Sequence, residues 1–245
     1  ATILPWIASK SEIKHHITIM RTTGIMESVL YEKIDAIIND YPKVNVAFLP
    51  RFTGVDLRIS STNEDALNKW VDLVLPVIEK YHFGGEGVAL EDAVGELLID
   101  CGKTIATAES CTGGLIGDRF TNVSGSSAYY KGGIVAYRNE VKHDMLDVKK
   151  DTLETYGAVS EETALEMAIG VRKKLSSDIG LSTTGIAGPT GGTDEKPVGL
   201  IYVGLSHENG EKVYKFTFTP SRLTNKLMTS QAALNITRLY LLYGS

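Results

Sequence analysis

The sequence predicts an α/β protein in which a three-layer α/β/α domain with a mixed sheet follows a small α+β domain. Strand-like and helix-like hydrophobic periods alternate through the second half of the chain, which is typical of layered α/β domains. Near the C-terminus, strand-like segments follow one another without a helix between them, which indicates that part of the sheet is antiparallel. Glycines in the segment 84–87 separate the two halves and are typical of a flexible linker.

The first domain, residues 1–83, should contain three strands and two helices in the order β-α-β-β-α. Alternating apolar residues predict the strands, and apolar residues at helical spacing predict the helices. Ser61 and Glu64 fit a capping box at the start of the second helix, and residues 50–54 should form a turn. The strands are predicted at residues 16–20, 44–48 and 55–59, and the helices at residues 26–38 and up to residue 78.

The second domain, residues 88–245, should alternate helices and strands around one sheet. Its first helix begins near residue 90 and should end at Gly102, because glycine favours the position after a helix C-terminus. The other helices are predicted from residue 115 onward and at residues 139–146, 161–175 and 221–243, and the strands at residues 104–108, 128–137, 179–184, 198–206 and 212–219.

Composition narrows the class of protein. A net charge of −5 without a basic cluster argues against general attraction to nucleic acid, so no nucleic-acid partner is expected. No apolar stretch approaches the roughly 18 residues needed to cross a membrane, and the first ten residues lack the features of a signal peptide. Two cysteines, Cys101 and Cys111, imply neither a disulfide framework nor a zinc cage. We expect a cytoplasmic protein without a membrane partner, and a homodimer as the commonest kind of oligomer.

Ser110 is the first candidate for chemistry, because it lies between an apolar strand and a glycine-flanked helix start. A side chain at such a junction stands at the edge of the sheet and faces solvent. The backbone amides from Cys111 to Gly114 would point outward there and could hold a developing oxyanion. The alternative is that Ser110 only caps the helix, which is a far commoner role for serine.

A nucleophilic serine needs a base, and Lys142 is a candidate. None of the five histidines lies in a recognisable triad motif, although triads assemble in space and a Ser-His-Asp site stays open. Lys142 lies one turn into a helix that Asn139 could cap, and both the helix N-terminus and burial would lower its pKa. The alternative is an ordinary solvated lysine.

The segment 183–192 follows a strand and is rich in glycine, so its backbone could approach a phosphate or carboxylate closely. It lacks the Gly-Lys-Ser/Thr ending of a P-loop and is not a dinucleotide fingerprint, and a mobile connecting loop is the alternative. Arg222 could bind a phosphate or be an exposed charge at the helix end. Tyr137 could stack on a ring or pack in a core.

Four ordered motifs resemble the CinA C-terminal family, also called the PncC nicotinamide-nucleotide amidases. Each motif alone is weak, but together they span most of the second half, and a chance match of all four is very improbable. The motifs are TAESCTGG at 107–114, YYKGG at 129–133, YRNEVK at 137–142 and TGIAGP at 184–189 with glycines at 191 and 192.

The resemblance implies hydrolysis of the carboxamide of nicotinamide mononucleotide, which gives nicotinate mononucleotide and ammonia. In that family a serine attacks the amide and a lysine serves as base, without a metal or other cofactor, and these roles map onto Ser110 and Lys142. The partner implied is a small-molecule substrate. The implied substrate contacts are Tyr137, Thr184 and Arg222, together with the glycine-loop positions Gly113, Gly114, Gly185 and Gly188.

The first half resembles the KH-type domain of long CinA proteins, chiefly through Arg21–Ile25 and the helix after it. Residues 1–83 contain no Gly-x-x-Gly loop, which KH domains need to grip nucleic acid, so RNA binding is not expected. Long CinA proteins also carry an N-terminal molybdopterin-binding-like domain. This chain lacks it, so an ADP-ribose pyrophosphatase activity should be absent, and the start at Ala1 is consistent with a fragment of a longer protein.

Two other interpretations stay open. A catalytically silent module could bind a nucleotide or a protein through the same pocket, although intact Ser110 and Lys142 favour the enzyme. Cys111 could be the nucleophile, because a cysteine beside a helix start can be acidified. Separate replacement of Ser110 and Cys111 by alanine would distinguish the two nucleophiles.

Overall fold

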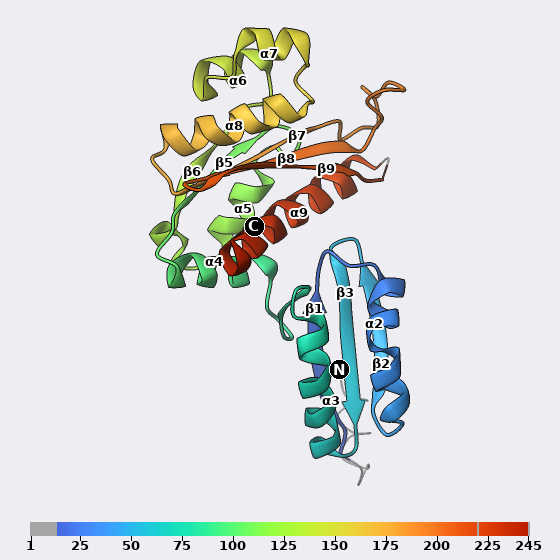
Figure 1. The fold of residues 1–245 in the computed structure, drawn as a ribbon. Coiled ribbons are helices and arrows are strands. Elements are labelled where there is room, and N and C mark those ends of the chain that lie inside the picture. The colour runs from blue at the N-terminus through green and yellow to red at the C-terminus, as the bar shows by residue number, and fades with distance from the viewer. Residues whose placement is uncertain (1–13, 220, 245) are drawn as a thin grey trace, which may run out of the picture. The chain divides into compact units, whose positions relative to one another are not determined.

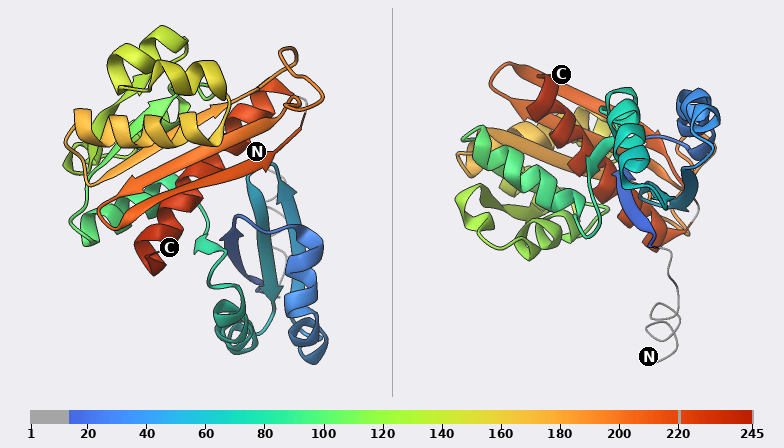
Figure 2. Two further views of the ribbon diagram at one scale, coloured as in Figure 1. Left: turned by 45° about the horizontal axis from the view of Figure 1, so that its top comes forward. Right: turned by 90° about the horizontal axis from the view of Figure 1, so that it is seen from below.

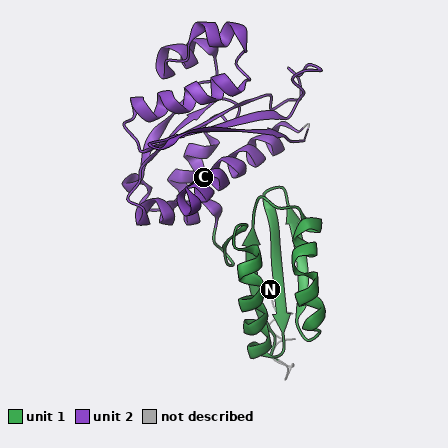
Figure 3. Cartoon of the chain, in the orientation of Figure 1, with its two compact units in different colours: residues 1–88 green, residues 89–245 purple. Residues whose placement is uncertain are grey.

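The computed structural model describes residues 14–219 and 221–244. The chain divides into two compact units, with the division after residue 88 (Figure 3). Part of the expected linker is ordered structure instead, because Gly84 ends the short strand β4 (His82–Gly84), which pairs with β1 (His16–Thr22). The glycine pattern therefore indicates where the two units meet. Because Gly84 pairs with the first unit, the boundary lies a few residues further along the chain than the first glycine.

Two sequence expectations concern membranes and export. Residues 1–13, on which the expectation of no signal peptide rests, lie outside the described residues. Within residues 14–219 and 221–244, the helices are too short or too polar to serve as membrane spans.

The first unit is an antiparallel sheet with two helices, in the predicted order β-α-β-β-α with β4 added. Its four strands are arranged in the order β2-β3-β1-β4. Strands β2 and β3 pair up to Arg51 and Gly54, so the turn between them is shorter than predicted. The remaining elements are α2 (Glu27–Asp40), β2 (Asn45–Arg51), β3 (Gly54–Ser61) and α3 (Glu64–Ile78).

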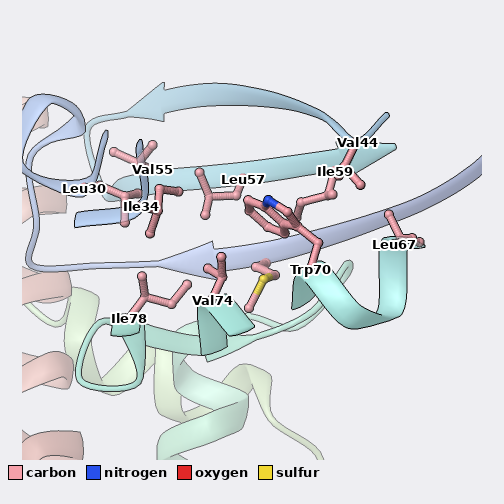
Figure 4. Packing of buried hydrophobic residues seen from close by; sticks show 11 residues of the cluster. Leu30, Ile34, Val44, Val55, Leu57, Ile59, Leu67, Trp70, Val74 and Ile78 are labelled. Atoms are coloured by element: carbon pink, nitrogen blue, oxygen red, sulfur yellow. The ribbon is translucent and has the colours of Figure 1, made fainter. Parts of the chain in front are cut away.

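One face of this sheet carries the core of the first unit (Figure 4). Val55, Leu57 and Ile59 alternate along β3 and therefore point to the same face. Leu30 of α2 and Trp70 of α3 pack into the same cluster, so both helices cover that face. Alternation in the strand and helical spacing in the helices thus agree on one two-layer arrangement.

The predicted capping box at α3 is wrong. The residue before the helix is Asn63, whose side-chain oxygen accepts a hydrogen bond from the amide of Ala66 at 2.9 Å. The hydroxyl of Ser61 instead accepts from the amide of Asn63 at 3.1 Å. Asparagine is as good a helix cap as serine. Asn63 caps α3 because it lies two residues closer to the helix than Ser61 does.

The second unit has three layers around a five-stranded sheet in the order β6-β5-β7-β8-β9. Helices α6, α7 and α8 lie on one face, and α4, α5 and α9 lie on the other (Figures 1 and 2). The predicted three-layer α/β/α fold is confirmed, and α7 was not predicted. The elements are α4 (Leu90–Asp100), β5 (Ile105–Glu109), α5 (Leu115–Asn122), β6 (Tyr130–Val135), α6 (Asn139–Leu146), α7 (Lys150–Thr155), α8 (Glu161–Lys174), β7 (Ile179–Gly185), β8 (Leu200–His207), β9 (Gly210–Thr217) and α9 (Arg222–Tyr243), with a single 3-10 turn at Ser126–Ala128.

The sheet is mixed, as predicted, and its parallel part defines one functional edge. Strand β5 pairs in parallel with β6 and β7, whereas β8 and β9 are antiparallel. The carboxyl ends of parallel strands meet at one edge, where ligands bind in open α/β sheets. Ser110 follows β5, Tyr137 follows β6 by two residues, and the glycine-rich segment follows β7.

Close packing of α6 on α8 sets the position of Lys142. Gly170 of α8 lies so near the backbone of α6 that an added Cβ would be 2.0 Å from the carbonyl oxygen of Leu146. Only glycine permits this approach. The last turn of α6 therefore packs directly on α8, and Lys142 lies one turn before Leu146.

Candidate active site

A pocket lies at the carboxyl edge of the parallel strands in the second unit. The empty space in it is about 470 Å³, which includes open solvent at its mouth. Polar groups converge there from β5, β7, α6 and α9, which are far apart in the sequence. The lining residues are Ser110, Cys111, Tyr137, Lys142, Ala158, Val159, Thr184, Gly185, Ala187 and Arg222.

Ser110 and Lys142 form a direct pair in this pocket. The Lys142 Nζ lies 3.2 Å from the Ser110 Oγ, and Lys142 is only 1 % exposed. Nζ also donates to the carbonyl oxygens of Ala136 at 2.8 Å and Tyr137 at 3.2 Å. When Lys142 is neutral, its amine has two N–H groups, and both can donate to these carbonyl oxygens. The lone pair of Nζ then faces the Ser110 hydroxyl.

The pKa of Lys142 is lowered from 10.5 to about 8, and the cause is burial. The predicted helix cap at Asn139 is wrong, because α6 begins with that residue and no side chain caps it. Burial therefore accounts for the lowered pKa, to which the helix N-terminus was also expected to contribute. The side chain is not an ordinary solvated lysine, and about one-tenth of it is uncharged at pH 7, far more than for a lysine with the usual pKa.

Cys111 is a poor candidate for the nucleophile. Burial raises the pKa of its thiol to about 12, and the negative charge of Glu109 acts in the same direction. The thiolate is the reactive form of cysteine, so this side chain is almost entirely unreactive near neutral pH. Burial thus lowers the pKa of Lys142 and raises the pKa of Cys111, and this difference favours Ser110 over Cys111 as the candidate nucleophile.

Of the four backbone amides expected to form an oxyanion site, Cys111 to Gly114, the last is already occupied. Glu109 is 2 % exposed, and its carboxylate accepts hydrogen bonds from the amides of Gly114 at 2.9 Å, Ile116 at 3.1 Å and Gly117 at 2.8 Å. The expectation that the Gly114 amide points outward to a ligand is therefore wrong. Ser110 is not the helix cap either, because that position is held by Gly114 in a left-handed conformation with φ of 95°.

The turn at residues 110–114, which we call the nucleophile turn after its candidate nucleophile Ser110, is also fixed to strand β7. The Ser110 amide donates to the Thr183 carbonyl oxygen at 2.9 Å. The hydroxyls of Thr112 and Thr183 are 2.7 Å apart. The neighbouring Thr184 hydroxyl lines the pocket and donates to the Ala158 carbonyl oxygen at 2.6 Å. Strand β7 thus fixes both the nucleophile turn and one wall of the pocket.

Arg222 links the glycine-rich segment to the start of α9. Its guanidinium donates to the Gly188 carbonyl oxygen at 3.0 Å and to the Tyr137 hydroxyl at 3.1 Å. Asn225 adds a 2.9 Å hydrogen bond from its amide nitrogen to the Ala187 carbonyl oxygen. This end of the segment is therefore held to α9. Tyr137 is 59 % exposed and lies at the pocket mouth, so it is not a core residue.

The structure brings six of the nine predicted site residues to the pocket wall. Gly113, Gly114 and Gly188 do not line the pocket. The Gly114 amide donates to Glu109, and the Gly188 carbonyl oxygen accepts from Arg222. Sequence reasoning missed Glu109, although an acidic residue shortly before a helix start is a recognisable signal. It also missed Ala158 and Val159, for which the sequence offers no signal. In the described part of the chain, no group of three or more His, Cys, Asp or Glu side chains could hold a metal ion.

Comparison with known proteins agrees with this architecture. The model of the CinA C-terminal domain matches residues 88–241, and that of the damage-inducible protein CinA KH domain matches residues 18–84. The CinA-like protein of Chloroherpeton thalassium is 48 % identical over 94 % of this chain, and that of Cytophaga hutchinsonii is 44 % identical over 90 %. The chain spans 57 % and 54 % of the lengths of these two relatives.

Solved structures of related proteins align with about three fifths of the chain. A competence/damage inducible protein, CihA, from Agrobacterium tumefaciens is 40 % identical with a TM-score of 0.59, covering 60 % of this chain and 90 % of its own. The competence damage-inducible protein A (ComA) from Klebsiella pneumoniae is 29 % identical with a TM-score of 0.62, covering 64 % of this chain and 97 % of its own. The chain belongs to the CinA family.

Proposed function

We propose that the protein hydrolyses the carboxamide of nicotinamide mononucleotide to nicotinate mononucleotide and ammonia. The observation that carries this proposal is the Ser110–Lys142 pair, in which a buried amine with a lowered pKa lies 3.2 Å from the serine hydroxyl. A buried neutral lysine beside a serine is suited to amide hydrolysis through an acyl-enzyme. The resemblance to the PncC amidases supports the choice of a pyridine carboxamide.

In the acylation step, Ser110 Oγ attacks the carboxamide carbon as its proton passes to Lys142 Nζ. The tetrahedral intermediate then carries an oxyanion, while Lys142 has become an ammonium group beside it. Collapse breaks the carbon–nitrogen bond, and Lys142 returns the proton so that ammonia leaves. The carbonyls of Ala136 and Tyr137 keep Nζ directed at the serine in both charge states.

Deacylation repeats these transfers with water as the nucleophile. Neutral Lys142 removes a proton from water as the water oxygen attacks the acyl carbon. Cleavage of the ester bond frees the carboxylic acid, and the proton on Lys142 restores the Ser110 hydroxyl. The acid loses its proton to solvent near neutral pH, so the product is a carboxylate. One base therefore serves both halves of the reaction.

Uncompensated positive charge supports a phosphate-bearing substrate. Among the described residues, no carboxylate forms an ion pair with Arg222 or with Lys226, which lies one turn further along α9. Nζ of Lys226 lies near the nucleophile turn, 3.6 Å from where a methyl group on Gly113 would be. A phosphate bound by these cations would orient the ring and its carboxamide toward Ser110.

The test is release of ammonia from nicotinamide mononucleotide by the purified chain and by its Ser110→Ala variant. Turnover by the parent and none by the folded variant would support both the reaction and the nucleophile. A folded parent that binds the mononucleotide in calorimetry but releases no ammonia would instead indicate a silent binding module. A folded parent with neither property would overturn the proposal.

A further inference from the structure

Glu109 immediately precedes Ser110 and has no part in the proton transfers. We propose that it is a positioning residue for the nucleophile: its carboxylate fixes the far end of the nucleophile turn and so keeps Ser110 Oγ within reach of Lys142. The inference rests on the proposed serine mechanism, but it does not depend on which amide is the substrate.

The hydrogen bonds of Glu109 form a closed loop around the nucleophile. The side chain reaches forward over residues 110–113 and accepts from the amide of Gly114 at 2.9 Å. The same carboxylate holds Ile116 and Gly117, which are already helical, at 3.1 Å and 2.8 Å. Ser110 therefore lies between the backbone of Glu109 and a helix start that the Glu109 side chain has fixed.

Strand β7 fixes the other points of the same turn. Thr183 accepts from the Ser110 amide at 2.9 Å, and its hydroxyl is 2.7 Å from that of Thr112. These contacts hold the beginning and the middle of the turn, but nothing in them holds Gly114. Within α5 the Gly114 carbonyl oxygen accepts from the Asp118 amide at 2.9 Å, and the Glu109 carboxylate ties this helix start back to the strand end before Ser110. Gly113 and Gly114 both have positive φ, so without this tie the helix start would be free to rotate relative to Ser110.

The burial of Glu109 means that its carboxylate depends on these hydrogen bonds. The residue is 2 % exposed, and no Lys, Arg or His among the described residues forms an ion pair with it. A buried carboxylate without a cation is costly unless it is fully hydrogen-bonded. The three amides and the positive end of α5 provide that compensation. A solvent-exposed serine or asparagine would cap the helix at lower cost, but it would not close a loop around Ser110.

The first experiment compares Glu109→Gln and Glu109→Asp with the parent in steady-state kinetics. Glutamine replaces one accepting oxygen with an NH₂ group, which cannot accept from a backbone amide, and aspartate withdraws the carboxylate by one methylene group. Both variants should lose roughly 10- to 100-fold in kcat, because a misplacement of about 1 Å has effects of this size, with KM within about twofold. The apparent pKa of the kcat profile should stay unchanged, because Lys142 itself is not altered.

Asp92→Asn is the matched control. Asp92 accepts from the amide of Ala89 at 2.8 Å in the first turn of α4, so this variant also converts a helix-start carboxylate to an amide. It has no link to the nucleophile turn, and its kcat should stay within about twofold of the parent. An equal loss of kcat in Asp92→Asn and Glu109→Gln would show general destabilisation and would overturn the proposal. Full activity in Glu109→Asp together with a shifted pH profile in Glu109→Gln would also overturn it, because charge rather than geometry would then be decisive.

A second measurement separates this inference from the choice of substrate. Phenylmethanesulfonyl fluoride forms an O–S bond with a reactive serine and releases fluoride, and mass spectrometry locates the adduct without any amide turnover. We expect labelling of Ser110 in the parent and in Asp92→Asn, and at least tenfold slower labelling in folded Glu109→Gln. Equal labelling rates in parent and Glu109→Gln, or no labelling of the folded parent, would contradict the proposal even if nicotinamide mononucleotide is hydrolysed. Slower labelling in the variant would support it even if that substrate is not hydrolysed.

Discussion

Lys142 Nζ lies 3.2 Å from Ser110 Oγ, although 32 positions separate the two residues in the sequence. The serine follows β5, and the lysine projects from the first turn of α6, which packs on α8. The contact therefore depends on the parallel pairing of β5 with β6 and on the approach of α6 to α8.

The pH dependence of turnover should report Lys142. The lysine must be neutral to accept the serine proton, and burial lowers its pKa to about 8. We therefore expect kcat/KM for nicotinamide mononucleotide to rise tenfold per pH unit below about 8 and to level off above it. A profile that is flat between pH 6 and 9 would contradict the role of Lys142 as base.

Lys142→Met should abolish turnover and make the protein more stable at pH 7. A lysine with a folded pKa near 8 and an ordinary value of 10.5 loses about 3 kcal/mol of stability as a buried cation. This cost is fully present below pH 8 and disappears as the pH rises toward 10.5, because the unfolded chain then binds more protons than the folded one. Lost contacts offset part of the gain, so we expect a net increase of about 1–2 kcal/mol. Urea unfolding at pH 7 and pH 10 tests this, and the advantage of the variant should shrink at the higher pH.

Cys111 should be unreactive, and its loss should be tolerated. Its buried thiol has a pKa of about 12, whereas Cys101 is exposed. Iodoacetamide at pH 7 should modify Cys101 and leave Cys111 intact, as read by mass spectrometry. Cys111→Ala should keep turnover within about tenfold of the parent, because buried cysteine acts as a small apolar residue. Loss of all turnover in a folded Cys111→Ala would revive cysteine as the nucleophile.

Gly170→Ala should disturb the site from a distance. The added Cβ would be 2.0 Å from the carbonyl oxygen of Leu146, so α6 must move away from α8 and carry Lys142 with it. We expect a loss of roughly 1–3 kcal/mol in the free energy of unfolding and a fall in kcat of tenfold or more. Gly95→Ala, in α4 on the opposite face of the sheet, is the control: its Cβ would lie 2.7 Å from the hydroxyl oxygen of the buried Tyr129, so it also disturbs packing but leaves the contact of α6 with α8 intact. That variant should keep its kcat, and a similar fall would argue against the packing explanation.

Arg222→Ala should affect the phosphate end of the substrate. The guanidinium lies at the pocket mouth, held by the Tyr137 hydroxyl and the Gly188 carbonyl oxygen. We expect kcat/KM for nicotinamide mononucleotide to fall by roughly 10- to 100-fold, as loss of a charged hydrogen bond costs about 1.5–3 kcal/mol. Turnover of nicotinamide riboside, which lacks the phosphate, should change by less than about threefold. Equal losses for both substrates would assign Arg222 to holding the loop instead.

Local patterns in the sequence determined most of the architecture. Alternation and helical spacing predict most of the strands and helices, because each reflects which side of an element faces a core. The short α7 escaped notice because its six residues are too few to show a period. The motifs indicate the roles of Ser110 and Lys142, whereas the spacing of these residues alone leaves the alternatives of a helix cap and a solvated lysine open.

Tertiary structure alone decided the electrostatic state of the site. The lowered pKa of Lys142 and the raised pKa of Cys111 both come from burial, which is produced by elements distant in the chain. The sequence shows an acidic residue before α5, but it does not show which amides the Glu109 carboxylate occupies, because the three hydrogen-bond donors converge only when the helix forms in that position. The sequence by itself determined which elements form and which residues are candidates for chemistry. Packing decided which of those residues meet, how far each is removed from water, and therefore which proton each one holds.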